Sequence, residues 1–199
     1  MRMPEFETYL KELRACTLCK ADMERAPNPI LQVSPTARIL IAGQAPGNLA
    51  DTTGIPFNDP SGDRLRDWMG VTRDEFYDAG RIAIVPMGFC FPGYDKSGGD
   101  IPPMKRCAGV WHEDLMARLP DIRLKLLVGG YAQKWHLKEK AAKTLTETVR
   151  NWRDLGDELF PTPHPSWRNT GWLKRNPWFE AEMVPVLRAS VRSLLDASS

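Results

Sequence analysis

A glycine- and proline-rich segment, residues 43–62 (GQAPGNLADTTGIPFNDPSG), carries several side chains that could act on a bound ligand. Its small residues allow a ligand to approach the backbone closely. Asp51 and Asp59 are its carboxylates, and either could hold a water molecule for attack or serve as a solvated loop or capping residue. Gln44 adds a neutral amide. The segment therefore predicts a binding loop at the end of the apolar run that precedes it.

A second group with chemical potential is His164, in the proline-flanked stretch PHPSW at residues 163–167. A neutral imidazole in such a rigid turn could donate a hydrogen bond to an oxygen that gains negative charge during a reaction. The alternative is a structural histidine that ties down the proline-rich loop. His112 and His136 fall in predicted helices, and we interpret both as structural.

The four cysteines form a third group: Cys16 and Cys19 make a C-x2-C pair, and Cys90 and Cys107 follow with 16 residues between them. Four buried thiols are one interpretation. A disulfide pair is disfavoured in a chain that we expect to be cytosolic. Zinc and a 4Fe–4S cluster both accept four thiolates, and the spacing alone does not choose between them. Either metal would tie the amino-terminal helix to the loop after the second strand.

Alternating strands and helices must position these groups. Apolar runs predict strands at residues 37–43, 81–86, 122–128 and 158–162. Helical spacing predicts helices over residues 4–15, 103–119, 131–137 and 141–153, a helix capped by Ser61, and a last helix from Asn176-Pro177 to Leu195 with a kink at Pro185. This alternation predicts one domain over residues 1–199, with an α/β fold of three α/β/α layers around a central, mainly parallel four-stranded sheet. Ligands of such sheets bind beyond the carboxyl ends of the strands, where the loop at residues 43–62, the segment after Val85 and PHPSW would gather.

The overall composition argues against several classes of protein. A formal net charge of +2 gives no general basic character, so binding to nucleic acid would need a local patch. No apolar run is long enough to cross a bilayer, and the sequence MRMPEFETYL has no apolar signal core. We expect a cytoplasmic, monomeric protein without a membrane partner.

Over about residues 10–190 the chain resembles the uracil-DNA glycosylase superfamily, and most closely its iron–sulfur branch, the family-4 enzymes. The first motif of that branch resembles the stretch from Gly43 to Gly47, and the second resembles His164-Pro165-Ser166. Four further positions of the first motif and the cysteine pattern also match, at Asp51, Gly54, Pro56, Phe57, Cys16, Cys19, Cys90 and Cys107. The resemblance implies a structural 4Fe–4S cluster on the cysteines and binding of a uracil flipped out of DNA.

The resemblance also assigns roles to residues. His164 would stabilise the departing base, Asp51 is favoured over Asp59 for the water, and Gln44 could contribute its amide. The base-binding set would be Gly43, Gln44, Ala45, Phe57, Asn58, Met87 and Gly88, with the Phe57 ring stacked on the base. The basic and aromatic segment after His164 would contact DNA through Ser166, Trp167, Arg168, Lys174 and Arg175. The loop at residues 94–99 is a second candidate for DNA contact.

Two positions depart from the family. Gln44 stands where the family usually has Glu, and Pro86 stands where it has an Asn that reads the edge of uracil. Proline offers no side-chain hydrogen bond. Despite these two departures, we predict a monofunctional uracil-DNA glycosylase that leaves an abasic site. A glycosylase for another deaminated base, such as hypoxanthine, and a non-catalytic protein that binds uracil-containing DNA are the alternatives.

Overall fold

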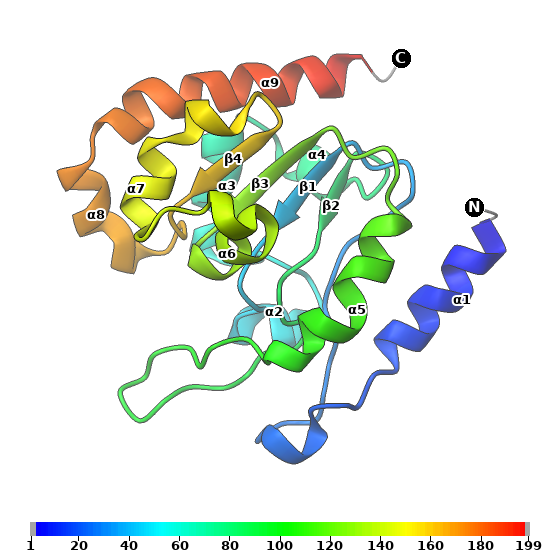
Figure 1. The fold of residues 1–199 in the computed structure, drawn as a ribbon. Helices are drawn as coiled ribbons and strands as arrows, with labels where there is room; N and C mark the ends of the chain where they lie inside the picture. Colours follow the sequence, from blue (N-terminus) through cyan, green and yellow to red (C-terminus); the bar gives the residue numbers. More distant parts are fainter. Residues whose placement is uncertain (1–2, 198–199) are drawn as a thin grey trace.

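A computed structural model describes residues 3–197; residues 1–2 and 198–199 of the predicted domain lie outside the described residues. At its centre is a sheet of four parallel strands in the order β2-β1-β3-β4 (Figure 1). The strands are β1 (Ile39–Ala42), β2 (Ile82–Ile84), β3 (Leu124–Val128) and β4 (Leu159–Thr162). The predicted parallel sheet of four strands is therefore confirmed, and each strand falls within its predicted range.

Helices cover both faces of the sheet because successive strand residues point to opposite sides and both sides are apolar. Ile39 and Ile41 pack on one face against α3 (Pro60–Met69), α4 (Arg73–Tyr77) and α9 (Val184–Asp196). Leu40 packs on the other face against α1 (Met3–Arg14) and α5 (Lys105–Ala117). The remaining helices are α2 (Asn48–Thr53), α6 (Gly130–Leu137), α7 (Leu145–Arg150) and α8 (Thr170–Arg175). These are the three predicted layers.

Three local features differ from the sequence expectations. Asp59, not Ser61, caps α3: its Oδ1 accepts the Gly62 N–H at 2.8 Å, and Pro60 takes the first helical position, which proline favours. Helices α2, α4 and α8 were not predicted, since five or six residues are too few to show helical periodicity. The predicted kink at Pro185 is instead a π-helical turn over Phe179–Met183, after which Pro185 lies in the first turn of α9.

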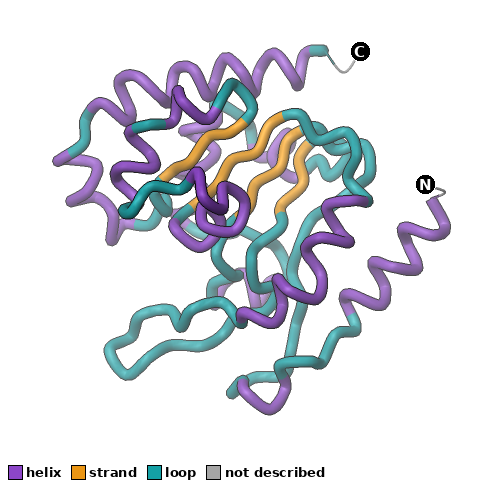
Figure 2. The backbone as a smooth tube through the Cα atoms, viewed as in Figure 1, coloured by secondary structure: helices purple, strands orange, loops and turns teal. Residues whose placement is uncertain are grey.

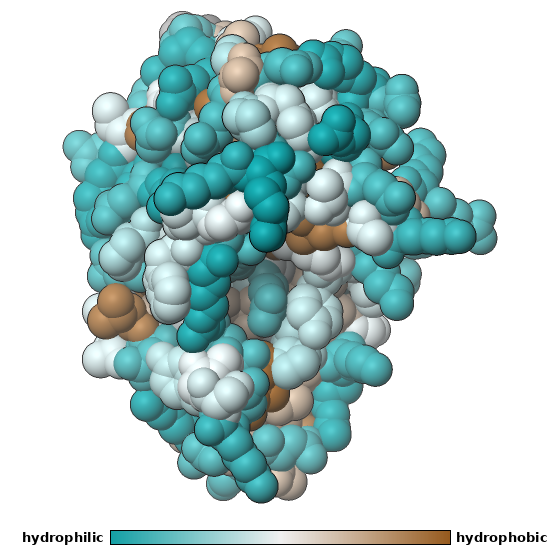
Figure 3. Space-filling model, turned by 90° about the vertical axis from the view of Figure 1, so that its left-hand side faces the viewer, coloured by the Kyte–Doolittle hydropathy of each residue, from teal (hydrophilic) through white to brown (hydrophobic). Residues whose placement is uncertain are grey.

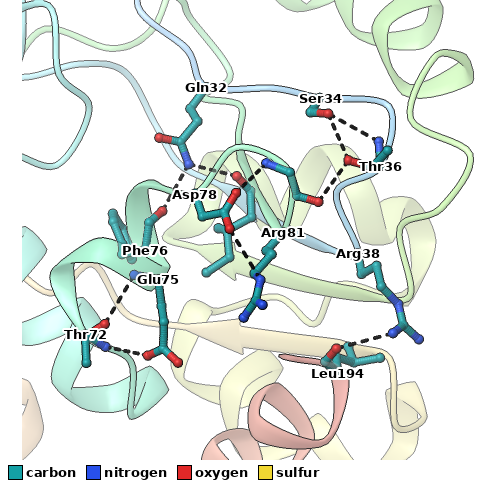
Figure 4. A network of polar contacts seen from close by, with 12 residues as sticks. Gln32, Ser34, Thr36, Arg38, Thr72, Glu75, Phe76, Asp78, Arg81 and Leu194 are labelled. Carbon is teal, nitrogen blue, oxygen red and sulfur yellow. Dashed lines mark hydrogen bonds and ion pairs between the residues drawn. The ribbon is translucent and has the colours of Figure 1, made fainter. Parts of the chain in front are cut away.

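Polar contacts fix the amino-terminal end of the sheet (Figure 4). Gln32 donates from Nε2 to the carbonyls of Phe76 and Ile82, at 3.0 and 2.8 Å. Thr72 and Glu75 form a capping box at the start of α4, and Asp78 pairs with Arg81 at 3.3 Å. These contacts lie at the end of the sheet opposite to the loops discussed below, and we interpret them as structural. None of the helices within residues 3–197 has the length and apolarity to span a membrane.

The loops that follow the strands gather below the sheet (Figure 2). They include the loop after β1, the segment after β2, and the long loop at residues 91–104. From the side of α8, the surface is mainly hydrophilic and is hollowed near its centre (Figure 3). The sequence predicted this arrangement, since the carboxyl ends of parallel strands meet at one edge.

Candidate active site

A cavity of about 430 Å³, here called the site cavity, lies where the loops after β1, β2 and β4 meet. It brings together eight of the predicted site residues: Gly43, Ala45, Phe57, Asp59, His164, Ser166, Trp167 and Arg168. Seven others do not line it: Gln44, Asp51, Asn58, Met87, Gly88, Lys174 and Arg175. Pro86, at the position where an Asn was expected, is part of the wall.

Phe57 is held in a strained backbone conformation. Its φ angle is +53°, in the left-handed region that L residues rarely adopt. The Phe57 carbonyl accepts the Tyr77 hydroxyl at 3.2 Å and an Arg66 N–H at 3.4 Å. It also packs on Gly62, where a Cβ atom would stand 1.8 Å from the carbonyl oxygen. Gly62 is therefore required for this backbone conformation.

The same contacts place the Phe57 ring in the cavity. The ring packs edge-on against Phe76, with centroids 6.3 Å apart and planes at 86°. Its centroid is 6.4 Å from that of His164, and the two planes are tilted by 30°. A Cβ atom at Gly43 would come within 3.4 Å of the ring, so glycine leaves this side open. One aromatic face and one imidazole therefore stand near each other in the site cavity.

His164 has a defined tautomer. Its Nδ1 accepts the backbone N–H of Ser166 at 3.2 Å, so the proton of the neutral ring must lie on Nε2. The His164 carbonyl accepts from Asn169 Nδ2 at 2.8 Å, which fixes the turn. Burial lowers the pKa of His164 below its ordinary value, although the charges of Asp59 and Asp100 oppose this shift. The site thus holds a neutral imidazole with an N–H donor.

The two candidate carboxylates occupy different places. Asp59 lines the site cavity and caps α3 through one carboxylate oxygen. Asp51 lies in α2, where its carboxylate accepts from Arg25 at 2.9 Å and from Asn28 Nδ2 at 3.4 Å. It does not line the cavity. The geometry therefore favours Asp59, and the preference for Asp51 does not fit the structure. The sequence could not reveal this, because Arg25 and Asn28 are more than 20 residues away from Asp51.

The expected backbone readers of the base have other partners. The N–H groups of Met87 and Gly88 donate to the carbonyls of Gly43 and Gln44, at 2.9 and 3.0 Å. These bonds hold the segment after β2 against the loop after β1. Asn58 accepts from Arg73 at 2.8 Å and donates to Thr53 at 3.4 Å. The amides of Met87 and Gly88 are thus already paired, and neither these two residues nor Asn58 lines the site cavity, where the sequence had placed them.

Contacts between loops shape the outer rim of the cavity. Trp167 is 77% exposed, and its neighbour Arg168 donates to the carbonyl of Gly98 at 3.0 Å. Arg64 on α3 donates to the carbonyls of Pro165 and Ser166, each at 3.2 Å, and so holds the turn that carries His164. Sequence reasoning missed Arg64, which lies about 100 residues before its partners. Lys174 and Arg175 are exposed on α8.

The sequence profile of the uracil DNA glycosylase superfamily matches residues 31–188. The chain belongs to this superfamily. Among solved structures it is similar to the solution NMR structure of a candidate uracil DNA glycosylase from Methanosarcina acetivorans, with 19% sequence identity and a TM-score of 0.48. That similarity covers 80% of this chain and 94% of the other. The assignment rests on the profile match, and membership indicates a glycosylase-type activity on DNA.

In this superfamily member the four cysteines are free thiols, two buried and two half-buried. Burial raises the pKa of Cys90 to about 11 and that of Cys107 to about 12, and the charges of the other cysteines add to both shifts. The thiols of Cys16 and Cys19 contribute to each shift, so the four sulfur atoms lie within electrostatic range of one another. Backbone N–H groups of Asn28 and Phe89 donate to Cys90 and Cys107.

Four neighbouring thiols with backbone N–H donors fit an iron–sulfur cluster in their chemistry. Within residues 3–197, however, no three His, Cys, Asp or Glu side chains are arranged to hold a metal ion. The two observations are compatible for a 4Fe–4S cluster, because each of its thiolates binds a different iron and the sulfur atoms stand further apart than around one zinc ion. The chemistry of the donor set therefore allows a cluster, and which metal it holds is a matter for proposal.

Proposed function

We propose that the protein is a monofunctional DNA glycosylase that hydrolyses the N-glycosidic bond of uracil in DNA and leaves an abasic site. The observation that carries the proposal is the neutral His164, with its Nδ1 occupied by the Ser166 N–H and its Nε2 proton free to donate in the site cavity beside Phe57. The proposal extends the superfamily assignment to a specific base and reaction.

A base inside the duplex cannot reach such a cavity, so the target nucleotide must be flipped out. In our proposal the base stacks on the Phe57 ring, a contact of about 1 to 3 kcal/mol for one base and one aromatic face. Cleavage then leaves negative charge on the base and positive charge on the sugar. The His164 Nε2–H would donate to the charged base oxygen, in an enclosed site where such a bond is stronger than in water.

Asp59 is the proposed partner of the attacking water. Its Oδ1 is fixed by the Gly62 N–H, and the carboxylate lines the site cavity. Its negative charge would also stabilise the positive charge that develops on the sugar. No lysine lines the site cavity in the described part of the chain, so no Schiff base with the sugar is expected. This supports hydrolysis without strand cleavage.

Pro86 bears on which base is removed, because it lines the site cavity and offers no side-chain hydrogen bond to the base. This observation favours hypoxanthine as the second candidate substrate, since recognition of uracil would lack its usual amide. The test is incubation of the purified protein with oligonucleotides that contain uracil, hypoxanthine or only normal bases, followed by alkali. Cleavage of the uracil strand supports the proposal, and cleavage of the hypoxanthine strand alone supports the alternative. Binding to uracil-containing DNA without cleavage would indicate a non-catalytic binding protein.

We further propose that DNA is held by the segment after His164. The exposed Trp167 stands at the cavity rim, where an aromatic ring could fill the gap that a flipped base leaves. Arg168, Lys174 and Arg175 follow it as phosphate contacts. The protein would act as a monomer in the cytoplasm, and both properties follow only from the sequence expectations.

We also propose a structural 4Fe–4S cluster held by Cys16, Cys19, Cys90 and Cys107. Bound there, the cluster would join the segment after α1 to the loop after β2 and to α5. It would also keep the thiols deprotonated, although burial alone favours the neutral form. Purified protein should be brown and contain about four iron atoms per chain. Stoichiometric zinc without iron would contradict this proposal.

A further inference from the structure

A second cavity, here called the α5–α6 cavity, lies between α5 and α6 and has a volume of about 910 Å³. It is larger than the site cavity, and the segment after β2 contributes to both: Pro86 lines the site cavity and Met87 lines the α5–α6 cavity. The proposed glycosylase chemistry uses none of its residues. Its volume suits a ligand of the size of a small organic molecule.

The inner wall is mainly apolar. Met87, Met104, Met116, Ala108 and Trp135 line it. Thioether side chains adapt their shape and make favourable contacts with aromatic rings, and an indole offers a flat face. This wall therefore suits a flat aromatic ligand better than a flexible polar one.

Two imidazole groups provide the polar contacts inside the cavity. His112 is fully buried, and its Nε2 donates to the Pro86 carbonyl at 3.0 Å, so the Nδ1 of the neutral ring is a bare acceptor. Phe89 stacks on this ring at 5.3 Å between centroids, and Trp135 packs edge-on at 5.8 Å, which fixes its orientation. Burial lowers the pKa of His112 and that of His136 to about 4, so both rings are neutral near pH 7.

Both rings carry a buried nitrogen that lacks a partner. Neither His112 Nδ1 nor His136 Nε2 has a hydrogen-bond partner among the described residues. Buried polar atoms without partners are rare in folded proteins and call for an explanation. A metal ion is not indicated, because no third ligand joins the two histidines in residues 3–197. A bound molecule with an N–H donor would satisfy His112 Nδ1.

The rim of the cavity is cationic. Lys105, Lys134 and Lys138 line it together with a single acidic residue, Glu113. All four side chains are exposed. A ligand that reaches from the apolar wall to the rim would therefore carry a negative charge at its outer end.

We propose that the α5–α6 cavity binds a nucleotide. The base would lie against the methionine and tryptophan wall, a small shift of the cavity lining would let it donate an N–H to the buried His112 Nδ1, and the phosphate would lie among the rim lysines. A free mononucleotide and a nucleotide of a bound DNA strand share this chemistry. His112 also donates to the Pro86 carbonyl, and Pro86 lines the site cavity. A ligand in the α5–α6 cavity that moves His112 would therefore also move the wall of the site cavity.

The test is a titration of the purified protein with deoxyadenosine 5′-monophosphate, followed by calorimetry and by the ¹⁵N resonances of the histidine rings. We expect saturable binding at one site per chain, together with a shift of the His112 Nδ1 resonance. Deoxyadenosine, which lacks the phosphate, should bind at least about tenfold more weakly. Lys134→Glu should weaken mononucleotide binding to a similar extent, whereas the matched control Lys11→Glu, on α1, should not. Both lysines are exposed, so neither variant threatens folding.

Preloading with an oligonucleotide that carries an abasic site distinguishes the two sources. If DNA supplies the nucleotide, preloading abolishes mononucleotide binding, and Lys134→Glu also weakens binding of the oligonucleotide. If the ligand is a free nucleotide, preloading has no effect. Absence of saturable binding, a shift confined to His164, or equal affinities for Lys134→Glu and Lys11→Glu would overturn the proposal. Because no base excision is measured, failure here is separate from failure of the proposed glycosylase function.

Discussion

Gly62→Ala is expected to destabilise the protein because of one contact. A Cβ atom at residue 62 would lie 1.8 Å from the Phe57 carbonyl oxygen, 2.8 Å from its carbon and 3.0 Å from the Phe57 Cβ. Since real Cβ contacts essentially never fall below 3.0 Å, the backbone at Phe57 or at the start of α3 must move by more than an ångström. Either movement disturbs the conformation that places the Phe57 ring in the site cavity.

The cost can be worked out from the contacts that this movement breaks. Loss of the cap between Asp59 Oδ1 and the Gly62 N–H, 2.8 Å long, costs about 1 kcal/mol. Forced overpacking costs about 1 to 3 kcal/mol. The higher helix propensity of alanine offsets up to about 1 kcal/mol. The free energy of unfolding should therefore fall by about 1 to 4 kcal/mol, which lowers the Tm by roughly 2 to 16 °C at this chain length.

Urea and thermal unfolding of protein with matched metal content would measure this change. Gly109→Ala is the matched control, because Gly109 is a helical glycine of α5 and an added Cβ meets nothing within 4 Å. It should leave stability unchanged or raise it by up to about 1 kcal/mol. Equal stability of the Gly62→Ala variant and the parent protein would refute the proposed packing of Phe57 on Gly62.

Three further predictions concern the carboxylates, DNA binding and pH. Asp59→Asn should slow single-turnover excision more than Asp51→Asn, because only Asp59 lines the site cavity; the opposite order would place the water near α2. Neutralising Lys174 and Arg175 should weaken binding to any DNA sequence and reduce the salt slope by roughly one unit for each lost phosphate contact, whereas an unchanged slope would locate DNA elsewhere. The pKa of His136 is lowered to about 4, so between pH 6 and 5 the unfolded chain binds the extra proton and stability falls as pH falls. His136→Phe should reduce that slope in urea unfolding by about 1 kcal/mol per pH unit, and an unchanged slope would show that His136 is not buried in its neutral form.

The sequence was sufficient for the layers and for the end of the sheet that carries the site. Apolar runs such as residues 122–128 are buried on both sides, and such runs indicate parallel strands without knowledge of the partners. Phe57 and His164 were predicted because each falls in a motif that resembles the family, and His164 also follows β4 closely. These features depend on neighbours in the chain, which sequence patterns record.

The features that the sequence did not predict depend on partners far away in the chain. Arg64 contacts the carbonyls of Pro165 and Ser166 across about 100 residues. The sequence favoured Asp51 over Asp59, because it does not show the contacts of Asp51 to Arg25 and Asn28. The amides of Met87 and Gly88 were expected to hydrogen-bond the base. They donate instead to the carbonyls of Gly43 and Gln44, which lie more than 40 residues earlier in the chain.

The most direct test of the central claim is the single-turnover rate of uracil excision by the His164→Ala variant, measured beside the parent protein and Gln44→Ala. Our account predicts a loss of about a hundred- to a thousandfold for His164→Ala, with DNA binding retained, because a fixed donor to the departing base is removed. Gln44→Ala should lose far less, since Gln44 does not line the site cavity. A near-normal rate for His164→Ala would contradict the account.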